Sequence, residues 1–330
     1  MNDLLILRAR DINNIFDDKE KEIIDIVSKA YVAHTAGEDS LPHSIFLRFS
    51  ADSLNRIIGL PAYLKSDVNS AGLKWISSFP DNIKHGMERA SAILILNDIN
   101  NGHPKAVLES SIISAKRTAA SAALAATVLH SNREETTIGF CGCGRINKEI
   151  TSFLKVCFPT ITDFYAYDIS KERCESFLND IGDGTIQTTA VHSVEELMEK
   201  APLVSYATTV GVPYISDFKG IKGNTTILNI SLRDFSPEVV LACDNVVDDL
   251  DHVCRERTSI HLTEQKCNNR DFVRCPIADV VTGKQPSRVG NKPVMYSPFG
   301  LGVLDLALGT YALKKAEEHG LGIKIDDFLP

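Results

Sequence analysis

Several features that would mark a specialised class of protein are missing from this chain of 330 residues. It has no low-complexity tract and no internal repeat, and its apolar segment 119–129 is too short to span a bilayer. The apolar stretch at 4–7 is short and is followed by charges, so no signal peptide is expected. The net charge is −8, and no dense basic stripe offsets it. These absences predict a cytoplasmic protein that binds neither membranes nor nucleic acid.

The patterns of a metal site are missing as well. Cys141 and Cys143 have C-x-C spacing, but no second close pair accompanies them among the eight cysteines. The nine histidines include no H-x-x-x-H pair, and we interpret His85, His103 and His192 as solvated loop residues. We therefore predict no metal ion, and reduced, unreactive thiols.

The most informative segment that is present lies at 136–147. It reads as a short apolar strand, a Gly-x-Gly turn and the start of a helix. Gly142 permits the tight turn, and Gly144 lets the backbone approach a pyrophosphate at the helix N-terminus. The next predicted strand, 164–167, is followed by Asp168, whose carboxylate can bind a ribose diol and repels a 2′-phosphate. This order predicts a site for NAD rather than NADP; an ordinary glycine-rich turn is the alternative.

Two details of this loop concern how the cofactor is held. Asn147 stands where the usual fingerprint has its third glycine, so we expect the helix to pack slightly less closely on its strand. The loop residues that we predict to contact the cofactor are Gly142, Cys143, Gly144, Arg145 and Ile146.

The chain that follows has the pattern of an α/β fold. From residue 136, apolar strands alternate with helices, which predicts a doubly wound, Rossmann-type parallel sheet with helices on both faces. Its strands are expected at 136–141, 162–167, 202–206, 226–231, 245–248 and 294–296.

A different pattern precedes this region. A helix is expected at 19–36, where apolar residues recur with helical spacing. Four apolar runs separated by turn residues then predict a small, mostly antiparallel sheet at 45–49, 57–60, 72–76 and 92–96. The first part of the chain is therefore expected to be an α+β domain.

The domain boundaries follow from two helices. An Ala-rich helix at 109–130 is expected to link the two parts. The last helix, 304–317, follows the final Rossmann strand and is expected to return to the first part. We therefore predict a discontinuous α+β domain at 1–118 and 303–330, and a Rossmann domain at 119–302.

Four basic residues outside the loop are candidates for substrate binding. Lys74 lies in an apolar strand and faces either solvent or a polar cavity. Arg117 lies on a helix of small residues, from which it can reach a carboxylate or phosphate; a surface ion pair is the alternative. Arg48 and Arg56 flank a possible hairpin connection. Together, these four residues could clamp an anionic substrate.

Residues that follow the parallel strands are candidates for acid–base chemistry. Ligands bind beyond the carboxyl ends of such strands. Asp234 follows the strand at 226–231 and could act as an acid or base, although an Asp in a loop is common. Ser231 precedes it, and Thr208 follows an earlier strand and could line the nicotinamide side of the site. We predict that Thr208 and Ser231 contact the cofactor.

The order of several short motifs resembles the ornithine cyclodeaminase/mu-crystallin family over almost the whole chain. These motifs are Gly72-Leu73-Lys74, Leu96-Asn97-Asp98, Gly102-His103-Pro104-Lys105-Ala106, Glu109, Arg117-Thr118-Ala119-Ala120 and Gly142-Cys143-Gly144. The resemblance implies an NAD-binding homodimer, joined through the N-terminal domain, with a small-molecule substrate. It implies that Lys74, Arg117 and Arg48 hold the substrate α-carboxylate and that Asp234 is catalytic. It also implies that Arg117 and Thr118 contact the cofactor, and that Asp305 occupies a recurring position of the family.

Within this family, the chain looks closest to the branch that makes L-2,3-diaminopropionate for siderophores, on the segments 56–58, 72–76 and 82–98. Ornithine cyclodeaminases carry a glutamate shortly before the proline matched by Pro61. Here the segment 57–61 has no carboxylate, and Arg56 is added nearby, which fits a more anionic substrate. The resemblance therefore implies NAD-dependent oxidative cleavage of N-((2S)-2-amino-2-carboxyethyl)-L-glutamate to L-2,3-diaminopropionate and 2-oxoglutarate, with formation of NADH. An ornithine cyclodeaminase, another amino-acid dehydrogenase or ketimine reductase, and a non-catalytic nucleotide-binding protein are the alternatives.

Overall fold

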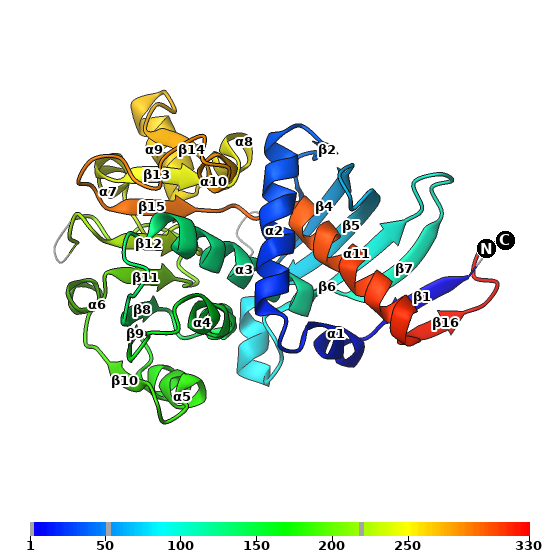
Figure 1. Cartoon of the computed structure of the whole chain (residues 1–330), viewed down its shortest axis with the longest axis horizontal. Helices are drawn as coiled ribbons and strands as arrows, with labels where there is room; N and C mark the ends of the chain where they lie inside the picture. Colours follow the sequence, from blue (N-terminus) through cyan, green and yellow to red (C-terminus); the bar gives the residue numbers. More distant parts are fainter. Residues whose placement is uncertain (1–2, 51–53, 218–220) are drawn as a thin grey trace. The chain divides into compact units, whose positions relative to one another are not determined.

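The computed structural model describes residues 3–50, 54–217 and 221–330. The chain forms two compact units, residues 1–117 with 301–330 and residues 118–300 (Figure 1). Each unit contains its own eight-stranded sheet. The α/β fold class predicted from the sequence is confirmed, with a parallel sheet in one unit and a mixed sheet in the other.

The sheet of the first unit is mostly antiparallel, as the sequence predicted, but it is larger. Its strand order is β16-β1-β7-β6-β5-β4-β2, and β3 pairs with β4. Parallel pairing joins β1 to β7, while the other pairs are antiparallel. The strands are β1 (Leu4–Leu7), β2 (Asp39–Ser40), β3 (Ile45–Arg48), β4 (Arg56–Leu64), β5 (Ser70–Ser78), β6 (Ala90–Asn97), β7 (Pro104–Glu109) and β16 (Ile323–Ile325).

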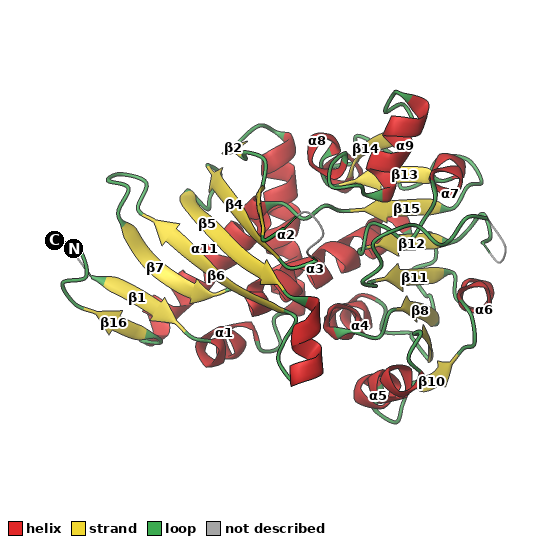
Figure 2. Cartoon of the chain, turned by 180° about the vertical axis from the view of Figure 1, so that it is seen from behind, coloured by secondary structure: helices red, strands yellow, loops and turns green. Residues whose placement is uncertain are grey.

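Helices cover one face of this sheet. Figure 1 shows α2 and α11 on the same side of the strands, and Figure 2 shows the opposite side of β4–β7 without a covering helix. The backbone of α11 lies close to the sheet at Gly309, because a Cβ atom there would lie 2.1 Å from a methyl group of Leu94. The helices of this unit are α1 (Ala9–Phe16), α2 (Glu20–Thr35), the 3₁₀ helix η1 (Pro80–His85) and α11 (Gly302–His319).

The second unit is a doubly wound parallel sheet. Its strand order is β10-β9-β8-β11-β12-β15-β13-β14, and every neighbouring pair is parallel. The strands are β8 (Thr137–Cys141), β9 (Asp163–Tyr167), β10 (Gln187–Ala190), β11 (Leu203–Tyr206), β12 (Thr226–Asn229), β13 (Asp244–Val247), β14 (Val273–Pro276) and β15 (Val294–Ser297). The helices are α4 (Arg145–Cys157), α5 (Lys171–Ile181), α6 (Val194–Lys200), α7 (Pro237–Ala242), α8 (Leu250–Val253), α9 (Ser259–Cys267) and α10 (Ile277–Val281).

The helix α3 (Ser111–Leu129) contains the boundary between the two units. It begins two residues later than the sequence predicted, because Glu109 ends β7 and its carboxylate accepts the backbone N–H groups of Ser111 and Ile112. By length and composition, α3 could cross a membrane, but 78% of its most apolar window is buried inside the protein. Such burial is typical of a core helix.

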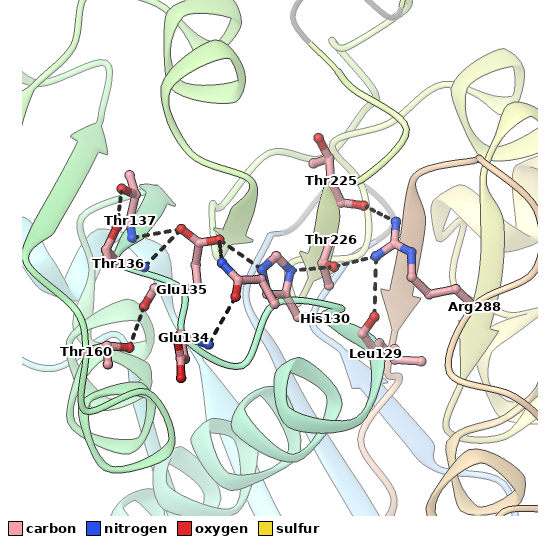
Figure 3. Close-up of polar contacts among 11 residues, drawn as sticks. Leu129, His130, Glu134, Glu135, Thr136, Thr137, Thr160, Thr225, Thr226 and Arg288 are labelled. Carbon is pink, nitrogen blue, oxygen red and sulfur yellow. Dashed lines mark hydrogen bonds and ion pairs between the residues drawn. The ribbon is translucent and has the colours of Figure 1, made fainter.

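A buried polar network holds the C-terminal end of α3 against the parallel sheet (Figure 3). The ring of His130 contacts Thr226 Oγ1 at 3.0 Å and Glu135 Oε2 at 3.2 Å. Arg288 donates to the same Thr226 hydroxyl and to the carbonyl of Leu129. Thr226 is the first residue of β12, so the network lies at the amino ends of the strands, whereas ligands of such sheets bind at the carboxyl ends. We interpret it as structural.

Candidate active site

Lys74 is buried near the middle of β5, where only 2% of it is exposed. Its Nζ lies 2.6 Å from Oδ2 of Asp305 on α11 and donates to Ser114 Oγ of α3 at 3.3 Å. The ion pair with Asp305 therefore explains why a lysine occurs in this apolar strand, and its side chain does not face solvent. Burial lowers the pKa of Lys74 to about 8. The charge of Asp305 opposes this effect, whereas the charge of Arg117 adds to it.

Asp305 joins Lys74 to a second cation. The Nε of Arg117 lies 3.3 Å from Oδ1 of Asp305, while Lys74 contacts the other carboxylate oxygen. Asp305 is fully buried. The cluster Lys74–Asp305–Arg117 therefore holds two positive charges and one negative charge. The charge that remains, in a region of low dielectric, favours a further carboxylate.

Arg48 and Arg56 lie in the same sheet but farther along it. They occupy directly opposite positions of β3 and β4, and Arg56 is in turn opposite Ser78 of β5. Directly opposite residues share a face, so both arginines lie on the face of Lys74, which is four positions from Ser78. The connection between these strands includes residues 51–53, which are outside the described residues. Both arginines therefore lie on the face of the sheet that carries Lys74, but among the described residues no contact joins either of them to Lys74.

The second unit contains the glycine-rich loop at the predicted place, between β8 and α4. Gly142 has a φ of +86°, and a Cβ atom on it would lie 2.6 Å from the carbonyl oxygen of Ala207. Gly144 is the N-cap of α4, and a Cβ atom on it would have no neighbour within 4 Å. The backbone at Gly144 is therefore open at the point where α4 begins.

Asp168 follows β9 beside this loop, as predicted. One carboxylate oxygen accepts the backbone N–H of Cys143 at 2.8 Å, and the other accepts that of Ser170 at 2.9 Å. A carboxylate offers about four lone pairs. It can therefore hold the loop and still accept the hydroxyl groups of a ribose.

Asn147 has a function that the sequence did not indicate. Its side chain is fully buried, donates to the carbonyls of Cys141 and Gly142, and accepts the hydroxyl of Ser205 at 2.7 Å. The position of the missing third glycine is thus filled by an amide that ties α4 to the loop and to β11.

Asp234 lies in the loop after β12 and is fully buried. Thr208 donates to its Oδ1 at 2.7 Å, and Ser231 donates to its Oδ2. The Tyr214 hydroxyl, which lies 3.4 Å from Cys141 Sγ, also acts on this carboxyl. Burial raises the pKa of Asp234, although the hydrogen bonds from Ser231, Thr208 and Tyr214 oppose this effect.

The structure thus brings three predicted site residues, Thr208, Ser231 and Asp234, into one cluster at the carboxyl ends of adjacent strands. The hydroxyl groups of Thr208 and Ser231, predicted as cofactor contacts, are directed at Asp234. Two residues with hydrogen bonds to the site were missed. Ser114 precedes Arg117 by three positions on α3, a spacing that places them on one helix face and could have identified it. Tyr214 lies in an irregular segment with no such signal.

Thr118 and the cysteines are the remaining candidates. Thr118 is half-buried on α3, next to Arg117. All eight cysteines are free, and six of them are buried. Among the described residues, no group of three or more His, Cys, Asp or Glu side chains could hold a metal ion.

Comparison with known proteins decides the family. The model of the ornithine cyclodeaminase/mu-crystallin family matches residues 8–320. The chain belongs to this family. The resemblance identified from the short motifs is therefore confirmed.

Three similar proteins illustrate the range of the family. The chain is 28% identical to N-((2S)-2-amino-2-carboxyethyl)-L-glutamate dehydrogenase of Staphylococcus aureus, over 98% of both chains. It is 25% identical to alanine dehydrogenase of Archaeoglobus fulgidus, again over 98% of both. Among solved structures, Δ1-pyrroline-2-carboxylate reductase of Thermococcus litoralis, in complex with NADH and L-proline, matches with a TM-score of 0.89 and 25% identity. That match covers 97% of this chain and 100% of the reductase.

Proposed function

We propose that this protein is an NAD-dependent oxidoreductase that cleaves N-((2S)-2-amino-2-carboxyethyl)-L-glutamate to L-2,3-diaminopropionate and 2-oxoglutarate. The observation that carries the proposal is the buried cluster Lys74–Asp305–Arg117, which has the charge to hold an amino-acid carboxylate. The glycine-rich loop of the second unit supports the redox chemistry, and the similarity to the dehydrogenase of Staphylococcus aureus supports the substrate.

The loop between β8 and α4 fits a dinucleotide. The open backbone at Gly144 leaves room for a pyrophosphate, and the N-terminus of α4 provides N–H donors and a positive dipole. Asp168, which accepts the Cys143 N–H of this loop, can also accept the hydroxyl groups of the adenine ribose, and its charge disfavours the 2′-phosphate of NADP. When bound, NAD supplies the hydride acceptor.

The residues of the chain would then control the position and the protons of the substrate. Lys74 and Arg117 would hold the carboxylate on the reacting carbon and so fix the orientation of its C–H bond. Loss of hydride leaves a C=N bond at that carbon. Water adds to the carbon, and collapse of the carbinolamine releases the amine of diaminopropionate and the keto group of 2-oxoglutarate. These last steps need a proton acceptor and a proton donor, and Asp234, whose pKa is raised by burial, suits this exchange.

The choice of substrate rests on charge. The proposed conjugate carries three carboxylates, and arginines bind carboxylates in a bidentate manner. An ornithine substrate would instead place a terminal ammonium in the site, and burying that charge without a partner costs several kcal/mol. The segment 57–61, which in cyclodeaminases includes a glutamate, has no carboxylate here.

We also propose that the protein is a cytoplasmic homodimer formed through the first unit. The sheet face opposite α11 exposes large apolar side chains, with Ile45 63%, Leu47 45%, Ile93 42% and Trp75 38% exposed. The strand registers place all four on one face. A contiguous apolar face of this kind is typical of an interface between subunits.

A comparison of substrates tests the activity. The purified protein is incubated with NAD and either the glutamate–diaminopropionate conjugate or ornithine, and NADH, 2-oxoglutarate and proline are measured. We expect equimolar NADH and 2-oxoglutarate from the conjugate and little proline from ornithine. Proline formation without net NADH would assign the chain to the cyclodeaminases instead.

A further inference from the structure

Arg89 is a half-buried arginine in the first unit that was not among the predicted site residues. It immediately precedes β6, and its Nη1 donates to Ser78 Oγ at 3.3 Å. Among the described residues, no carboxylate lies within ion-pair distance of Arg89. Burial alone lowers its pKa. A guanidinium that is partly removed from water, and that within the described part of the chain is hydrogen-bonded only to a hydroxyl, is well suited to bind an anion.

The contact of Arg89 with Ser78 places it beside two other arginines. Ser78 is directly opposite Arg56, and Arg56 is directly opposite Arg48. Three arginine residues therefore lie at one end of this sheet.

This end of the sheet lies on the same face as Lys74. Lys74 and Ser78 are four residues apart on β5, which corresponds to about 13 Å between their Cα atoms. The helix α11 packs on this face of the sheet. Its residue Gly302 lies near Leu60 and Ala62, and its residue Gly309 lies near Leu94. Between Lys74 and Ser78, the face is formed by Ile76 and, on the adjacent strand, Ile58, which are only half-buried.

We propose that Arg89 forms a second carboxylate subsite at this end of the sheet, which selects substrates with a carboxylate beyond the one on the reacting carbon. This inference rests on the proposed function, because it takes Lys74 and Arg117 to hold the first carboxylate. In the conjugate, the other two carboxylates are four and five bonds from the first, or roughly 5–6 Å in an extended chain. The long Lys and Arg side chains reach across the remaining distance.

The test measures steady-state kinetics with three substrates. The first is the conjugate, the second has glutamine in place of glutamate, and the third has 1,2-diaminoethane in place of diaminopropionate. We expect Arg89→Gln to raise KM for the conjugate about tenfold or more with little change in kcat. For the analogue that lacks the carboxylate bound at the subsite, the variant and the wild type should have equal KM values. A KM ratio that is the same for all three substrates would overturn the proposal.

Two further variants keep the test decisive. Arg10→Gln removes an arginine from the same unit whose side chain is 71% exposed, and it should leave all three KM values unchanged. Arg89→Lys retains the charge but not the planar fork, so its KM should lie between those of the wild type and Arg89→Gln. If Arg89→Gln does not fold, a wild-type KM for Arg89→Lys would overturn the proposal.

The proposed function is tested separately from the subsite. If it is wrong, the wild-type protein will form no NADH when it is incubated with the conjugate and NAD. The subsite is then tested by calorimetric titration with propane-1,2,3-tricarboxylate. Binding that is about tenfold weaker to Arg89→Gln than to the wild type and to Arg10→Gln supports the subsite. Equal binding to all three proteins overturns it.

Discussion

Lys74 and Asp305 are 231 positions apart in the sequence, yet their side chains form an ion pair of 2.6 Å in the interior of the first unit. Asp305 also contacts Arg117, so a single buried carboxylate holds both cations of the proposed substrate clamp. Without it, two like charges would face each other in a region of low dielectric. Asp305 is therefore the residue on which the orientation of Lys74 and Arg117 depends.

The first prediction concerns stability. Asp305→Asn removes the negative charge and leaves two buried cations, so we expect unfolding to require about 3–5 kcal/mol less free energy. Urea denaturation of the wild type and the variant measures the difference. Lys315→Gln, on the same helix and in an exposed ion pair with Glu318, is the control and should change stability by less than about 1 kcal/mol. A similar loss in both variants would contradict the role assigned to Asp305.

The second prediction concerns pH. Lys74, with a pKa of about 8, is protonated below that pH and loses its charge above it. If its ammonium holds the substrate carboxylate, kcat/KM falls as the pH rises through about 8. Asp305 raises the pKa of Lys74, so Asp305→Asn should move this fall to lower pH.

The pH profiles of the variants are compared on one substrate, so that titration of the substrate amine is common to all of them. Lys74→Arg should lose the fall near pH 8, because a guanidinium stays charged in this range. An unchanged profile in Lys74→Arg would exclude Lys74 as the titrating group.

The third prediction concerns the clamp itself. Lys74→Ala and Arg117→Ala should lower kcat/KM by at least the value of a charge-assisted hydrogen bond, roughly 1.5–3 kcal/mol, while NAD binding is largely retained. Titration of NAD into the folded variants decides between substrate and cofactor roles. Lost NAD affinity in Arg117→Ala would support the cofactor contact that the family resemblance implies for this residue.

The fourth prediction concerns proton transfer. Asp234→Asn preserves the shape of the side chain but cannot accept a proton, so we expect kcat to fall on the order of 10²–10⁴-fold while substrate still binds. Asp271→Asn, at an exposed position of the same unit, is the matched control and should retain the wild-type rate. A near wild-type rate in Asp234→Asn would make Lys74 the more plausible acid–base group.

The fifth prediction concerns cofactor choice. Asp168→Asn keeps a hydrogen-bond acceptor for the loop but removes the charge that repels a 2′-phosphate. The preference for NAD over NADP in kcat/KM should therefore fall by about tenfold, or about 1.4 kcal/mol. Both cofactors are compared on the same substrate. Wild-type protein that uses NADP as well as NAD would contradict the assignment of Asp168.

The sequence determined the parts of this protein that depend on local patterns. The Gly-x-Gly turn, Asp168 and Asp234 lie at the predicted ends of strands, because alternating strands and helices leave little freedom for where a parallel sheet presents its loops. The edge strands β10 and β14 were not predicted, since their residues give only short apolar signals. The strand β1 was not predicted because its partners, β7 and β16, are distant in sequence.

Only the tertiary structure decided how the charged residues are paired. Lys74 and Arg117 could be recognised as unusual in an apolar strand and an alanine-rich helix, but the sequence left open whether each faced solvent. Their common partner, Asp305, comes from a helix that follows the entire Rossmann unit. Arg89 donates a hydrogen bond to Ser78, and strand pairing places Ser78 directly opposite Arg56. Such contacts depend on which elements pack together, and local residue patterns carry no information about that packing.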